Sequence, residues 1–71
     1  MKTSFQAYRV DLRRQPSGTI VSVVVVAPSY SDAEKAIVVA ERIDAHADWN
    51  TEILSITLIA DEVFDLKGRR L

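Results

Sequence analysis

Apolar and polar residues alternate along the first segment of the chain, 5–13. Its apolar positions are Tyr8, Val10 and Leu12. This period of two predicts a β-strand with one buried side and one side facing solvent. Residues 19–27 are rich in β-branched side chains and predict a second strand. Pro16 and Gly18 lie between the two segments and are typical of a tight turn, so the pattern predicts a β-hairpin over 4–27.

The pattern changes to helical spacing after Pro28, which cannot donate a hydrogen bond to a strand ladder. Ser31 and Glu34 have the spacing of a capping box, which indicates the start of a helix. Small apolar residues then recur at steps of three and four over 33–47 and predict a helix with one apolar side. Alternation returns over 51–60 and predicts a third strand.

These elements predict an α+β fold, a small β-β-α-β(β) sandwich in which one helix covers one face of a mainly antiparallel sheet. The sheet has three or four strands, because 61–67 fits either a short helix or an edge strand, and its alternation favours the strand. The third strand fits beside the first, antiparallel to it, or beside the second, parallel to it. The length of 71 residues is enough for one small domain, 1–71.

A single helix leaves the second face of the sheet uncovered. Strict alternation places five branched aliphatic residues and two arginines there: Ile20, Val24, Val26, Ile53 and Ile59, with Arg9 and Arg13. Burial of one such aliphatic side chain contributes about 1.5–3 kcal/mol, so leaving all of them in water forfeits much stability. Three explanations fit the pattern: the tail folds over the patch, two copies associate through the sheet face or a strand edge, or a different protein docks there.

Composition and motif content argue against catalytic chemistry. The chain has no cysteine, and its only histidine, His46, has acidic neighbours only at helix positions that point to other sides. Its two glycines are 50 residues apart and form no phosphate-binding loop. No serine or threonine lies in a nucleophile motif. We therefore expect no enzyme activity, no catalytic residue, no cofactor and no metal.

The overall charge is close to balance. Nine basic residues against ten acidic ones give a net charge of −1, which argues against strong bulk attraction to phosphate or acidic lipid. The longest apolar run, Val23–Ala27, is far shorter than the roughly 20 residues of a membrane-spanning helix. The first residues also lack an apolar run of signal-peptide length. We therefore expect a cytoplasmic protein without a membrane partner.

Two clusters of arginine favour an alternative function, the binding of nucleic acid. Arg13 and Arg14 lie at the first hairpin, and Arg69 and Arg70 lie at the C-terminus. If the clusters meet in space, they form a basic stripe on a nearly neutral protein. However, the sheet lacks exposed aromatic side chains on which bases could stack. Arginines at a strand edge also keep that edge soluble, so nucleic acid is the less favoured partner.

In length and element order the chain resembles small β-β-α-β proteins of bacteria, phages and other mobile elements. Some of those, such as certain anti-CRISPR inhibitors, act by occluding a host protein. The resemblance implies an accessory or inhibitory role and assigns no role to any single residue. We therefore expect a non-catalytic protein-binding module that forms a homodimer, with a different protein as a further partner. The predicted interface consists of Arg9, Arg13, Val24, Val26, Ile53 and Ile59.

Overall fold

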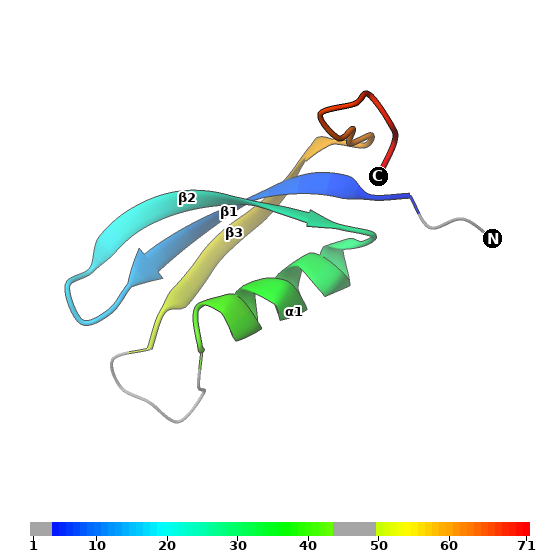
Figure 1. Ribbon diagram of the computed structural model, residues 1–71. Coiled ribbons are helices and arrows are strands. Elements are labelled where there is room, and N and C mark those ends of the chain that lie inside the picture. The colour runs from blue at the N-terminus through cyan, green and yellow to red at the C-terminus, as the bar shows by residue number, and fades with distance from the viewer. Residues whose placement is uncertain (1–3, 44–49) are drawn as a thin grey trace.

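A computed structural model describes residues 4–43 and 50–71 of the chain. Four elements follow one another: β1 (Gln6–Arg14), β2 (Thr19–Ala27), α1 (Tyr30–Ala40) and β3 (Glu52–Ala60). The three strands form one sheet, and α1 lies across one of its faces, as Figure 1 shows. The predicted α+β fold, with one helix on an antiparallel sheet, is therefore confirmed.

The strands are ordered β2-β1-β3, and β1 is antiparallel to both of its neighbours. Of the two placements compatible with the sequence, β3 therefore takes the one beside β1. The central strand carries much of the core, because the side chains of Val10 and Leu12 are completely buried. Both pack with Ile37 of α1, whereas Tyr8 packs with Ala33 of the same helix. The core thus lies between β1 and α1.

β3 pairs with β1 in an interrupted register. Asp11 lies opposite Ser55, but the next residue, Leu12, lies opposite Ile53. Leu54 is therefore an extra residue, a β-bulge, which shifts the alternation of β3 by one position. Ile53, which strict alternation places on the face away from the helix, instead packs against the core. The prediction that Ile53 belongs to the exposed patch is wrong, because alternation alone cannot foresee the bulge.

α1 begins two residues earlier than the sequence pattern predicts. Its N-cap is Ser29, whose Oγ accepts a hydrogen bond from the Asp32 N–H at 3.2 Å. Ser31, the predicted cap, lies inside the helix and is exposed. The helix ends at Ala40, before the end of the predicted apolar stripe. The segment between Pro28 and the first helical turn is therefore shorter than expected.

Residues 61–71 form a compact loop and not the fourth strand that their alternation favours. A single bridge pairs Phe64 with Arg70. Between them, the Asp65 carboxylate accepts hydrogen bonds from two backbone N–H groups of the turn, at 2.8 and 2.9 Å. This side chain closes the chain on itself, so the segment does not extend the sheet.

The loop is tied to the start of β1. The Phe5 N–H donates a hydrogen bond to the Leu71 carbonyl at 3.3 Å. Figure 1 shows 61–71 on the side of the sheet opposite α1, at the end where β1 begins and β3 finishes. Ala7, which lies at this end of β1, is buried. The tail therefore lies over one end of the second face and leaves the rest open.

Candidate protein-binding surface

Three aliphatic side chains of β2 are exposed on the face of the sheet opposite α1. They are Ile20, Val24 and Val26, with exposed fractions of 60%, 62% and 43%, and we call them the β2 strip. They alternate with Val21, Val23 and Val25, which pack against the core. Because successive side chains of a strand point to opposite faces, the strip forms one line along β2, interrupted only by Ser22.

Both arginines of the predicted interface lie beside the β2 strip. Arg9 of β1 lies opposite Val24, and Arg13 lies opposite Ile20. The structure therefore brings Arg9 and Arg13 together with Val24 and Val26, as the alternation of the two hairpin strands predicts. Ile20 completes the apolar line at the hairpin end.

Ile59, another residue of the predicted interface, lies apart from the β2 strip. A second interruption of the β1–β3 register makes it an extra residue, and this is the second bulge of β3. Its side chain is exposed, but β1 separates it from β2. With Ile53 packed against the core, β3 contributes neither of its predicted residues to the strip.

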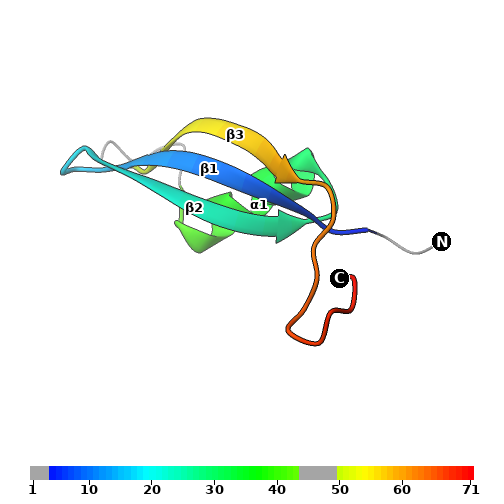
Figure 2. The ribbon, with the colours of Figure 1, turned by 90° about the horizontal axis from the view of Figure 1, so that it is seen from above.

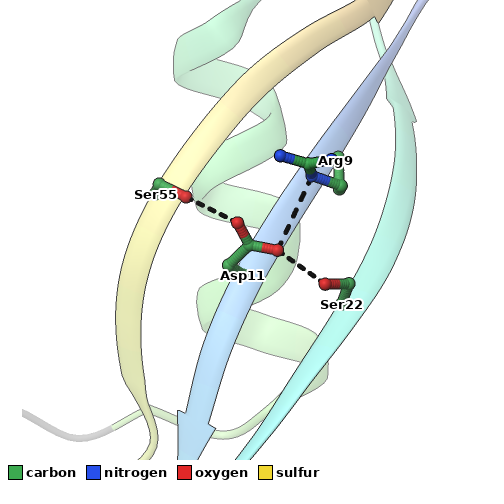
Figure 3. A network of polar contacts seen from close by, with 4 residues as sticks. All are labelled: Arg9, Asp11, Ser22 and Ser55. Carbon is green, nitrogen blue, oxygen red and sulfur yellow. Dashed lines mark hydrogen bonds and ion pairs between the residues drawn. The ribbon is translucent and has the colours of Figure 1, made fainter.

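A polar cluster occupies the centre of the same face (Figure 3). The Asp11 carboxylate accepts hydrogen bonds from Ser22 Oγ of β2 at 2.6 Å and from Ser55 Oγ of β3 at 2.8 Å. Arg9 Nε lies 3.6 Å from the same carboxylate. The two serine hydrogen bonds, with a smaller contribution from the Arg9 charge, hold the pKa of Asp11 below its ordinary value although desolvation opposes them. Asp11 is therefore negatively charged at neutral pH and connects all three strands.

This polar cluster crosses all three strands, and its Ser22 lies within the β2 strip, between Ile20 and Val24. The pattern along the chain does not by itself predict this cluster. Alternation places Asp11, Ser22 and Ser55 on one face, but their contact requires β1 to be the central strand. The apolar surface is consequently a line along one edge of the sheet, narrower than the patch that strict alternation predicts.

The arginines of the nucleic-acid alternative are mostly ion-paired. Arg13 pairs with Glu52 at 3.4 Å, Arg14 with Glu41 at 2.8 Å, and Arg70 with Glu62 at 2.7 Å. Hydrogen bonding to Glu41, together with the charge of that residue, raises the pKa of Arg14. Arg69 belongs to the loop that Asp65 closes. Figure 1 places the hairpin and the tail at opposite ends of the sheet, so the two clusters do not form one stripe.

Neither a group of metal ligands nor a membrane-spanning helix occurs in the described residues. Across 4–43 and 50–71, no three or more histidine, cysteine, aspartate or glutamate side chains are grouped so that they could hold a metal ion. In the same part of the chain, no helix has the length and apolar character needed to cross a membrane. His46, the only histidine, lies outside the described residues.

Comparison of the chain with protein-family models, with curated proteins and with solved structures finds no match. The β2 strip and the polar cluster are therefore the features of the described residues from which a function can be proposed.

Proposed function

We propose that this protein is a small non-catalytic protein–protein interaction module that associates with a second copy of itself through the β2 strip. The observation that carries the proposal is the exposure of three aliphatic side chains in one line. Full burial of such a side chain contributes about 1.5–3 kcal/mol. Given the exposed fractions of 60%, 62% and 43%, complete burial of the strip contributes about 2.5–5 kcal/mol to a complex, and partial burial contributes a corresponding share.

The described residues, 4–43 and 50–71, leave the strip uncovered. The tail, 61–71, crosses the end of the sheet where both β3 and β2 finish (Figure 2), whereas the strip runs along β2 from the hairpin to that end. All three strip residues stay exposed with the tail in place. Contact with a second copy along β2 therefore removes part of their apolar area from water.

The hydrogen bonds and the open surroundings of Asp11 support a non-catalytic role. Both of its carboxylate oxygens accept hydrogen bonds from serines, and the side chain lies on an open sheet face. A lowered pKa of this kind arises from structural hydrogen bonds and does not require a reactive group. Following the resemblance in length and element order, we propose an accessory or inhibitory protein of the bacterial or phage type that acts in the cytoplasm.

Nucleic-acid binding by Arg13, Arg14, Arg69 and Arg70 stays a prediction. Carboxylates partner most of these side chains, which lowers the net positive charge that each presents to a phosphate. The signature of this alternative would be binding that weakens steeply as salt concentration rises.

Light scattering after size-exclusion chromatography, from micromolar to millimolar protein, tests the proposal. We expect the mass to rise toward that of two chains as concentration increases. Val24→Asp should abolish this rise, because it places a carboxylate within the strip. A wild-type protein that stays monomeric at millimolar concentration would contradict self-association.

The matched control is Thr57→Asp. Thr57 has the shape of valine, is exposed, and lies opposite Arg9 from β3, as Val24 does from β2. The control therefore introduces the same charge on the same face, on the other side of β1. Circular dichroism shows whether both variants fold. If both folded variants lose association, or if neither does, the assignment of the interface to β2 is wrong.

A further inference from the structure

The two outer strands differ in their capacity to accept another strand. β2 has nine residues, no charged residue and no proline, and it pairs with β1 without a bulge. Among the described residues, no strand pairs with its outer side. β3 begins with Glu52 and contains bulges at Leu54 and Ile59. Charges and bulges hinder the pairing of another strand with an edge, whereas a long, regular, apolar edge favours it. β2 is therefore the edge suited to extending the sheet.

We propose that two copies of this chain pair through β2, in antiparallel orientation, about a two-fold axis at Val23. The product is one continuous sheet in the order β3-β1-β2-β2-β1-β3, with both α1 helices on the same face. The inference rests on the proposed function, because it specifies how self-association occurs. An antiparallel pair of identical strands has two-fold symmetry, which is the commonest symmetry of homodimers.

With the two-fold axis at Val23, the pairing extends over the whole length of β2. Val23 is the middle residue of Thr19–Ala27, so every residue of β2 finds a partner. On the open face, Ile20 pairs with Val26 of the second copy, and Ser22 pairs with Val24 of the second copy. Such a seam forms about eight to ten backbone hydrogen bonds. Moving the axis by one residue would leave residues unpaired at one end of each strand.

Like charges do not meet across this seam. One row of side chains across the seam contains, in order, Arg9 and Val24 of one copy and Ser22 and Asp11 of the second copy. The other row reads Arg13 and Ile20, then Val26 and Ala7 of the second copy. Each arginine thus shares its row with an acidic or an apolar residue. Repulsion between directly opposed charges, which would prevent pairing of many strand edges, is absent here.

Pairing at the edge desolvates the polar cluster less than stacking of two sheet faces would. A second layer on the open face would remove the Asp11 carboxylate and the Arg9 guanidinium from water, which carries a large desolvation penalty. Edge pairing leaves both groups hydrated. It also places the β2 strips of the two copies side by side, so that their aliphatic side chains cover one another in part across the seam.

Two further elements reach past the edge of β2. Figure 2 shows the C-terminal end of α1 emerging beyond this edge on one side of the sheet, and 61–71 projecting beyond it on the other. Both segments carry exposed apolar side chains, Val39 on α1 and Leu66 in the tail. A second copy joined at β2 lies next to these segments, so the contact extends beyond the backbone seam.

Cysteine cross-linking tests the register, because the natural chain contains no cysteine. In the double variant Ile20→Cys/Val26→Cys, the proposed pairing places residue 20 of one copy opposite residue 26 of the other. Their Cα atoms are then about 4.5–5.5 Å apart, within the roughly 4.4–6.8 Å that a disulfide spans. In either single variant, the two thiols of a dimer are six residues apart along the seam, about 20 Å, which is too far. These single variants are the matched controls.

We expect oxidised glutathione to convert the double variant to a covalent dimer and to leave both single variants unlinked. Hydrogen exchange of the wild-type protein gives a second measurement that needs no variant. Outward amides of β2 should exchange more slowly at millimolar than at micromolar concentration, and outward amides of β3 should not change.

A wild-type dimer in which β2 amides stay unprotected, or in which a single cysteine variant cross-links, overturns the proposed pairing while self-association stands. A wild-type protein that is monomeric at every concentration overturns both the pairing and the self-association. Protection of β2 together with cross-linking of the double variant alone supports the pairing.

Discussion

Replacing Leu12 by alanine tests whether the core lies between β1 and α1. The Leu12 side chain is completely buried and packs with Ile37 of the helix. The substitution removes three carbon atoms. At about 0.8 kcal/mol for each buried CH₂, the unfolding free energy loses about 2.4 kcal/mol of hydrophobic transfer energy. The cavity that remains raises the expected loss to about 2.5–5 kcal/mol.

A loss of this size is large for so small a protein. At roughly 0.05–0.15 kcal/mol per residue, 71 residues correspond to an unfolding free energy of about 3.5–11 kcal/mol. A small single core places this protein toward the lower part of that range. We therefore expect Leu12→Ala to be partly unfolded in buffer at room temperature, with its urea midpoint close to zero.

The assay is urea denaturation followed by circular dichroism at micromolar concentration, where self-association contributes least. The matched control is Ile20→Ala, which truncates an aliphatic side chain of a neighbouring strand that is 60% exposed. We expect this control to lose less than about 1 kcal/mol of unfolding free energy. Equal losses in the two variants would refute the placement of the core. A larger loss for Ile20→Ala at millimolar concentration would report burial of the β2 strip in the dimer.

Two other substitutions test the cap and the polar cluster. Ser29→Ala should lower the unfolding free energy by about 1 kcal/mol, whereas Ser31→Ala should leave it nearly unchanged. A larger loss for Ser31→Ala than for Ser29→Ala in urea denaturation would contradict the observed cap. Because the Asp11 pKa is lowered in the folded protein, Asp11 stabilises the fold above its ordinary pKa of 3.8, and this contribution is lost as the pH falls through the folded pKa. The urea midpoint of Asp11→Asn should therefore fall less than that of the wild-type protein between about pH 5 and pH 2. If the two midpoints fall equally with pH, the polar cluster does not stabilise the fold through the Asp11 charge.

The hairpin could be predicted from the sequence because its signals are local. Alternation, β-branched residues and a turn containing Pro16 and Gly18 together define β1, β2 and the turn between them. The same alternation correctly placed Val24 and Val26 beside Arg9 and Arg13, since β1 and β2 pair without interruption. Where the register is regular, the pattern along the chain is sufficient to assign the face of each side chain.

The features that could not be predicted depend on contacts between distant segments or on competition between similar neighbours. The position of β3 beside β1, and with it the contact between Asp11 and Ser55, requires knowledge of the sheet order. The bulge at Leu54 turns Ile53 inward without any local signal. Ser29 and Ser31 offer similar caps, and the observed helix uses the first.

The tail shows how one polar side chain can override a strand pattern. Its alternation resembles that of the true strands, but the Asp65 carboxylate binds two backbone N–H groups of its own turn. A local turn of this kind competes directly with the sheet ladder for the same backbone groups. The apolar residues Phe64 and Leu66 are consequently left exposed on a loop.

The two bulges of β3 have a consequence for the valence of the molecule. A sheet with two regular edges could add copies without end and grow into a fibre. Here the ladder on β3 is broken at Leu54 and at Ile59, so of the two outer strands in the described part of the chain only β2 offers an uninterrupted edge. A unit with one such edge has a valence of one, so the proposed pairing through β2 would close at two copies. In the proposed dimer, the irregularity of β3 would thereby keep a β-rich chain with exposed aliphatic side chains from open-ended polymerisation.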